Sequence, residues 1–218
     1  MSARADAPAG SGARAGPSAR PLAYVLWHWK RAEVPAADYE ARQRAFHAAL
    51  AASPPAGFLG SFSVGLSGAP WAAGGAEAYE DWYLVRDFAA LGLLNEAAVT
   101  ASRAAPHDAA AAVAGGGSAG LFRLRLGTEL REPGHAHWFA KPAGEPYAGL
   151  LEEMEPLVAA AGGCLWMRQM TLGPATELCL HAPRRVELPA RLQARTLPLR
   201  AAWPALPAGV RAIGGGAA

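Results

Sequence analysis

The residues best suited to acid–base chemistry lie in two segments with the composition of β-strands. His28 falls in the aromatic run 22–30, while Asp81 and Tyr83 fall in the run 79–86. A histidine beside a carboxylate in a partly dry site is a workable general base near neutral pH. We therefore take His28, with Asp81 or Tyr83, as the candidate catalytic group. The alternative is that His28 is a half-buried residue with a purely structural role.

A second group of side chains has the chemistry of metal or haem ligands. His135 and His137 alternate on one strand-like segment, and Cys179 and His181 alternate on another. Imidazole and thiolate groups ~5 Å apart across neighbouring strands would suit zinc, copper or iron, and one histidine could hold haem. These spacings match no recognised ligand motif. We therefore assign no metal ligand and keep haem or a transition metal as an alternative to an unknown cofactor.

The order of the predicted elements shows how these residues would be positioned. In the first half, strands are expected at 22–30, 57–66, 79–86 and 120–127, and helices at 36–53 and 87–103. Asp87 suits the N-cap of the second helix. The Ala/Gly segment 104–119 is expected to be a soft connection, and 120–127 an exposed edge strand. This order is the β-α-β-β-α-β pattern of the ferredoxin-like fold.

The second half repeats much of that order. A strand at 135–141, a helix at 146–162, strands at 164–173, 175–182 and 194–203, and a short helical turn at 187–193 are expected. The second helix of this half is nearly missing. We therefore expect an α+β protein with two ferredoxin-like halves, at 21–128 and 129–204. The segment 1–20 is expected to be a disordered tail that is dispensable for stability, and 205–218 is expected to be a flexible tail.

This element order, over about 22–203, resembles the dimeric α+β barrel superfamily. The superfamily includes antibiotic-biosynthesis-type monooxygenases, EthD-like and NIPSNAP-like proteins, stress-responsive barrels and the haem-binding chlorite-dismutase group. The resemblance rests on element order, because the chain carries no motif specific to one branch. It implies two sheets closing into one barrel within the chain, as a monomer with an internal pseudo-dimer or as a homo-oligomer. It also implies a small hydrophobic or planar ligand.

Under this resemblance, one face of each sheet packs on helices and the other lines the barrel. Strand alternation places Trp27 and Trp29 on one face and His28 on the other. The tryptophans suit the helix layer, so we expect His28, Asp81 and Tyr83 to line the barrel. The Gly-rich loop 67–77 carries Trp71, either as a lid over a barrel mouth or as a surface anchor. The candidate ligand-binding residues are Tyr24, Ser61, Ser63, Trp71, His137 and His181.

Composition and charge exclude several classes of protein. Of 218 residues, 52% are hydrophobic and 17% charged, which favours a sizeable core. The net charge is +2, and residues 1–20 account for it, so a nearly neutral body argues against a nucleic-acid binder. No apolar run reaches the ~18 residues of a membrane helix, and no secretory signal is recognisable. Abundant Ala, Gly, Pro and Arg with scarce Lys indicate a GC-rich, bacterial-like genome.

The two cysteines are expected to be reduced. In the predicted hairpin, Cys179 lies opposite about Met167 to Gln169, and Cys164 lies well past them. A disulfide is then geometrically unfavourable, and reduced thiols without an export signal indicate the cytoplasm.

Three functions are consistent with these patterns. The leading one is a small-molecule enzyme or binder with its ligand in the barrel. The resemblance to the monooxygenase branch suggests cofactor-independent oxidation of a planar substrate. The alternatives are a haem- or metal-binding barrel and a non-catalytic association module.

Overall fold

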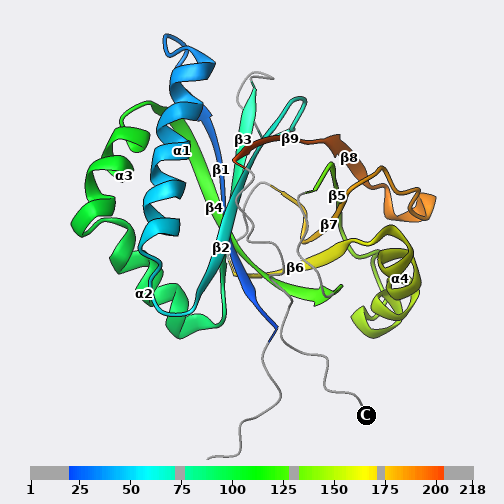
Figure 1. Ribbon diagram of the computed structural model, residues 1–218. Coiled ribbons are helices and arrows are strands. Elements are labelled where there is room, and N and C mark those ends of the chain that lie inside the picture. Colours follow the sequence, from blue (N-terminus) through cyan, green and yellow to red (C-terminus); the bar gives the residue numbers. More distant parts are fainter. Residues whose placement is uncertain (1–19, 72–76, 128–132, 171–174, 204–218) are drawn as a thin grey trace, which may run out of the picture.

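The structure is a computed structural model that describes residues 20–71, 77–127, 133–170 and 175–203. The tails expected at 1–20 and 205–218 lie outside the described residues, apart from Arg20. Within the described ranges the chain folds as an α+β protein with helices on the outside of a strongly curved sheet (Figure 1).

The described residues form one sheet of nine strands, in which every neighbouring pair is antiparallel. The order across the sheet is β8-β5-β7-β6-β4-β1-β3-β2-β9. The strands are β1 Leu22–Lys30, β2 Phe58–Leu66, β3 Ala78–Val85, β4 Ala114–Leu126, β5 His135–Phe139, β6 Cys164–Met170, β7 Leu178–Ala182, β8 Arg195–Pro198 and β9 Arg200–Trp203. The first half contributes the order β4-β1-β3-β2, and the second half contributes the corresponding order β8-β5-β7-β6.

The last two strands nearly close the sheet into a barrel. β8 and β9 lie at opposite edges of the sheet, yet only Leu199 separates them in the chain. The chain therefore draws the two edges together, as the arch formed by these strands in Figure 1 shows. The Arg195 guanidinium supports this closure by donating to the Gly68 carbonyl at 3.2 Å. The predicted fold class, an α+β barrel formed within one chain, is confirmed.

Among the described residues, four helices pack on the sheet. They are α1 Ala36–Ala52, α2 Phe88–Ala98, α3 Ala104–Ala111 and α4 Tyr147–Ala161, with 3-10 turns at Ala101–Arg103 and Ala190–Leu192. α1, α2 and α3 lie beside the first half, and α4 lies beside the second (Figure 1). Asp87 caps α2 as predicted, because its Oδ1 accepts from the Ala90 amide at 2.8 Å. None of the helices in the described ranges is long and apolar enough to cross a membrane.

The connection expected at 104–119 is regular structure instead. Its first part is α3, and β4 begins at Ala114 rather than at 120. β4 is also a central strand between β1 and β6, so the prediction of an exposed edge strand is wrong. Glycine explains the long strand, because a Cβ at Gly116 or Gly120 would lie within 3 Å of the Trp29 or Trp27 ring. Only a strand without side chains at these positions fits beside the tryptophans of β1.

The two faces of the sheet have the opposite surroundings from those predicted: the tryptophan face lines the barrel, and the face with His28 packs on the helices. Trp27 and Trp82 of the first half meet Trp138 and Trp166 of the second inside the barrel, with ring centroids 5.9 Å apart for Trp27–Trp138. The face that carries Tyr83 instead packs on the helices. The physical reason is volume, because the inner faces of both halves meet in the barrel and the largest rings fill that space.

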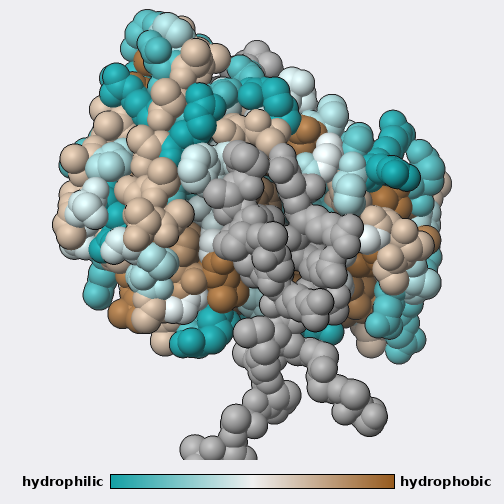
Figure 2. Space-filling view, viewed as in Figure 1, coloured by the Kyte–Doolittle hydropathy of each residue, from teal (hydrophilic) through white to brown (hydrophobic). Residues whose placement is uncertain are grey.

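The outer surface in Figure 2 is a mixture of hydrophilic and hydrophobic residues over α1 and α4. The exposed large hydrophobic residues include Phe88 and Leu93 of α2 and Val99, which follows α2. Both cysteines are buried, and they do not form a disulfide with each other. Cys164 lies opposite His181, and Cys179 lies opposite Trp166, one residue before the range predicted for it.

Candidate functional site

Asp81 forms the centre of a buried polar cluster between the sheet and α1. It lies on β3, between β1 and β2, and its residue is 2% exposed. Its Oδ2 accepts from the Tyr83 hydroxyl at 3.1 Å, and Nε2 of His28 lies 3.1 Å away. Nε2 of His47, from α1, lies 3.4 Å from the same oxygen. The structure thus brings the three predicted catalytic residues together, but on the helix side of the sheet and not in the barrel.

Asp81 and Tyr83 have opposite ionisation states in this cluster. Burial by itself would raise the pKa of Asp81, but His28 and His47 lower it, and the result lies well below the usual range. Burial, and then the negative charge of Asp81, raises the pKa of Tyr83 well above its usual value. Asp81 is therefore a carboxylate, and Tyr83 is a neutral phenol that donates to it.

Two further hydrogen bonds extend the cluster. Nδ1 of His28 lies 2.6 Å from the Tyr39 hydroxyl, which comes from α1. Nδ1 of His47 lies 2.7 Å from the Ser61 hydroxyl, so Ser61 contacts the helix layer and not the barrel. Ser63 is also buried on this side, and its hydroxyl has no hydrogen-bond partner among the described residues. The histidines are thereby oriented with one ring nitrogen toward Asp81 and the other toward a hydroxyl.

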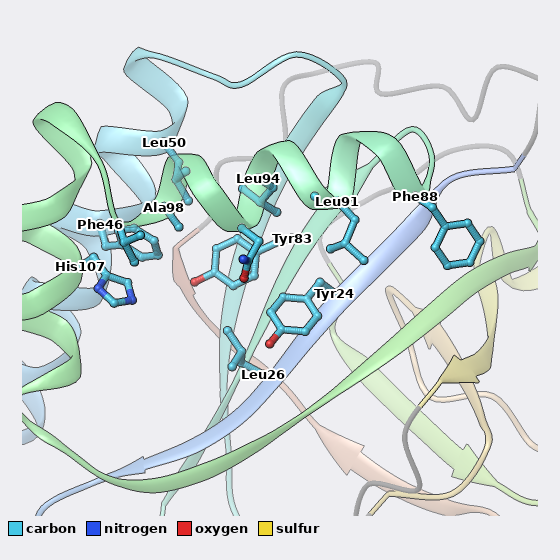
Figure 3. A pocket seen from close by; sticks show the side chains of 13 residues that line it. Tyr24, Leu26, Phe46, Leu50, Tyr83, Phe88, Leu91, Leu94, Ala98 and His107 are labelled. Carbon is cyan, nitrogen blue, oxygen red and sulfur yellow. The ribbon is translucent and has the colours of Figure 1, made fainter.

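A cavity of about 560 Å³ lies beside this cluster, between β1, β3 and the helices α1, α2 and α3. Figure 3 shows Tyr24 and Tyr83 reaching into it from neighbouring strands. Its remaining walls are mostly apolar and are formed by Leu26, Phe46, Leu50, Phe88, Leu91, Gly92, Leu94, Asn95, Ala98, Val99 and His107. Tyr83 is the residue that belongs both to the cavity wall and to the Asp81 cluster. This cavity has a volume typical of small-molecule sites.

The histidines of the second half lie on different faces of the sheet and form no cluster with Cys179. β5 and β7 pair so that His137 lies opposite Leu180 and Trp138 opposite Cys179. His137 therefore faces away from the barrel, whereas Cys179 and His181 face into it. Both ring nitrogens of His137 are occupied, by the Thr196 hydroxyl at 2.9 Å and the Val186 amide at 3.3 Å. In the described ranges, no three His, Cys, Asp or Glu side chains are grouped to hold a metal ion.

The remaining predicted ligand-binding residues are part of the barrel core. The His181 ring lies 4.4 Å from the Trp82 ring, and burial lowers the pKa of His181 to about 3. Trp71 is half-buried, with its ring 5.5 Å from Trp138 and 6.5 Å from Trp27. Residues 72–76 of the loop expected to form a lid lie outside the described residues.

Sequence reasoning missed Glu80, which faces the barrel. Glu80 is fully buried, and its two carboxyl oxygens accept from the Trp27 and Trp82 indoles at 3.2 Å each. Burial raises the pKa of Glu80 to about 7 although these bonds oppose the shift. The sequence did carry a signal for Glu80, because side chains alternate along a strand and this places Glu80 on the same face as Trp82.

His47 and His107 were also missed. His47 lies four residues after Gln43 and three before Leu50, so helical spacing places it on the buried face of α1. His107 lines the cavity from α3, with its ring 5.4 Å from Phe46. The Ala-rich segment that forms α3 carries no amphipathic pattern from which its helix could be predicted.

Comparison with known proteins identifies a fold and no closer relationship. No protein-family model matches the chain, and no curated protein matches it. A solved structure from Fusobacterium nucleatum subsp. nucleatum, named as a proposed monooxygenase, aligns with a TM-score of 0.56 and 10% identity over 84% of this chain and 93% of that chain. A similarly named protein from Lactobacillus acidophilus gives 0.54 and 10% over 84% and 94%. These proteins share the α+β barrel fold, and at this identity the likeness concerns the fold alone.

Proposed function

We propose that the protein binds a small, planar and largely apolar molecule in the cavity between the sheet and the helices α1–α3. The observation that carries this proposal is the apolar cavity with Tyr83 in its wall, hydrogen-bonded to the ionised Asp81. Apolar walls favour burial of an aromatic ligand, and a few polar groups orient it. The barrel interior is a poorer candidate because tryptophan rings from both halves pack there.

Filling the cavity tests this proposal. Ala98 lines the cavity from α2, so Ala98→Phe should occupy ligand space. The matched control is Ala159→Phe on the exposed side of α4. With 2-naphthol as the probe, isothermal titration calorimetry should show binding to the wild type and the control. We expect binding to Ala98→Phe to be at least about tenfold weaker. Equal binding by both variants, or none by the wild type, would refute the proposal.

The same cluster supports a catalytic role, namely cofactor-independent oxidation. Tyr83 would accept a proton from an acidic C–H or O–H of the ligand while its own phenolic proton moves to the Asp81 carboxylate. The resulting carbanion can react with O₂, so that a CH₂ group and O₂ give C=O and H₂O. The monooxygenase names of the two proteins with this fold are consistent with such chemistry.

Proton abstraction can be measured without oxygen. We expect the wild type to accelerate deuterium exchange at the acidic CH₂ of 2-tetralone in anaerobic D₂O, followed by NMR. Tyr83→Phe should lose about a hundredfold or more of that acceleration, the usual size of a general-base contribution. Tyr147→Phe removes an exposed tyrosine on α4 and should leave the rate unchanged. If Tyr83→Phe exchanges the label as fast as the wild type, the catalytic proposal is wrong even if 2-naphthol binds.

The two halves are best interpreted as a tandem pair of ferredoxin-like units. Their strand orders, β4-β1-β3-β2 and β8-β5-β7-β6, correspond strand by strand. Only the first half has a second full helix after its third strand, and the cavity lies under that helix. On this interpretation the first half binds the ligand and the second half completes the barrel.

A further inference from the structure

α2 contains a glycine that neither backbone conformation nor crowding requires. Gly92 lies in the middle of α2, where glycine is a poorer helix former than alanine. Its φ is not positive, and a Cβ built on it would meet no atom within 4 Å. By contrast, Gly120 of β4 has no room for a Cβ beside Trp27. A side chain at 92 would therefore be tolerated by the fold and would favour the helix.

Gly92 lies at the mouth of the cavity. The cavity-lining residues Phe88, Gly92, Asn95 and Val99 occur at helical spacing along one stripe of α2 and its C-terminus. All four are exposed, whereas Leu94 on the neighbouring stripe is buried in the cavity wall. This exposed stripe is thus the rim of the mouth, with a large ring at Phe88 and a gap one turn later at Gly92.

We propose that Gly92 determines which ligands the cavity admits, by leaving a notch in its rim. This inference rests on the proposed function, and it concerns planar ligands long enough to reach from the cavity to its rim. One end of such a molecule lies against Tyr24 and Tyr83, and the other projects through the notch between Phe88 and Asn95. The outer end can carry a hydroxyl or carbonyl group, because the Asn95 amide both donates and accepts hydrogen bonds at the rim.

Substitution at Gly92 separates this role from a merely structural one. Gly92→Leu should block the notch, and Ala89→Leu adds the same side chain at an exposed position of α2 that does not line the cavity. The probes are 2-naphthol, with two rings, and 1,8-dihydroxyanthraquinone, with three. We expect Gly92→Leu to bind the three-ring probe at least about tenfold more weakly and 2-naphthol within about twofold of the wild type. Ala89→Leu should bind both probes as the wild type does.

Stability provides the second measurement. Gly92→Ala should raise the melting temperature, as should Gly149→Ala in α4, where a Cβ is also free of close contacts. A raised melting temperature for Gly92→Ala supports the inference that glycine is not there for the fold. If Gly92→Ala instead lowers the melting temperature, glycine is needed structurally and the inference is overturned.

Three binding outcomes would also overturn the inference about Gly92. They differ in whether the proposed ligand-binding function survives. If Gly92→Leu binds the three-ring probe as the wild type does, the notch has no role. If the wild type binds 2-naphthol but not the three-ring probe, the cavity does not admit longer molecules, although the proposed function survives. If the wild type binds neither probe, this inference and the proposed function both fail.

Discussion

Glu80 and Asp81 are consecutive residues of β3 whose carboxyl groups have pKa values displaced in opposite directions. Asp81 faces α1 and is held as a carboxylate by His28 and His47. Glu80 faces the tryptophans of the barrel, where burial favours the neutral acid. Two carboxyl groups with different environments can perform different chemistry at one pH. Here one carboxyl group is ionised beside the cavity, and burial in the core favours the neutral form of the other.

Glu80 should make the stability of the protein decrease between weakly acidic and neutral pH. The pKa of Glu80 rises from 4.5 to about 7 on folding, so the folded state keeps a proton that the unfolded state releases over this range. The free energy of unfolding should fall by up to about 3 kcal/mol as pH rises through this window. Glu80→Gln should lack this decrease when urea unfolding is compared at pH 5 and pH 8. Parallel pH profiles for wild type and variant would show that Glu80 does not titrate in the fold.

At the scale of elements, the close approach of β4 to β1 depends on glycine in β4. The ring of Trp27 lies over Gly120 and that of Trp29 over Gly116, so β4 can lie beside β1 and connect the two halves. The same contact orients Trp27 into the barrel, where it donates to Glu80. The neighbouring residue His28 then faces the opposite side and reaches Asp81. The packing of β4 thus helps to position the polar cluster.

Gly120→Ala should therefore destabilise the protein. Its Cβ would lie 2.9 Å from the Trp27 ring, a distance that requires the ring or the strand to move. We expect a loss of about 1–3 kcal/mol in the free energy of unfolding, as for other overpacked cores. Gly149→Ala is the control, because its nearest contact would be at 3.9 Å. If both variants unfold at the same urea concentration, the tryptophan contact does not limit β4.

At the scale of the whole molecule, β9, the last strand of the described residues, nearly closes the barrel and covers the edge of β2. β9 pairs with β2, and Arg200 of β9 forms ion pairs with Glu40 at 2.6 Å and Glu77 at 2.8 Å. Glu40 belongs to α1, the helix that supplies His47 and Tyr39 to the polar cluster. The closure of the sheet and the placement of α1 are therefore linked.

A chain that ends after Leu199 should lose this closure. Without β9 the edge of β2 is exposed, and exposed strand edges promote self-association. We expect a lower melting temperature and a higher mass by light scattering than for a chain that ends after Trp203 and retains β9. Identical melting temperature and mass for the two chains would mean that β9 is not needed for closure.

Local patterns in the sequence were sufficient for most of the fold. Helical periodicity located α1 and α4, strand composition located β1 to β3, and Asp87 marked the start of α2, because each of these depends on neighbours in the chain. α3 escaped prediction since an alanine-rich helix has no apolar stripe. β4 was taken for an edge strand because its alternation of apolar and basic residues cannot reveal which strands flank it.

The sequence by itself determined that His28 and Asp81 could meet, because alternation and element order put them on the same face of adjacent strands. Only the tertiary structure decided which side of the sheet that is. Both faces of β1 carry aromatic residues, Tyr24 on one and Trp27 on the other, so hydropathy could not distinguish them. The choice depended on distant partners: Trp138 fills the barrel against Trp27, while α1 brings His47 to Asp81. Contacts between residues far apart in the chain leave no local pattern from which they can be predicted.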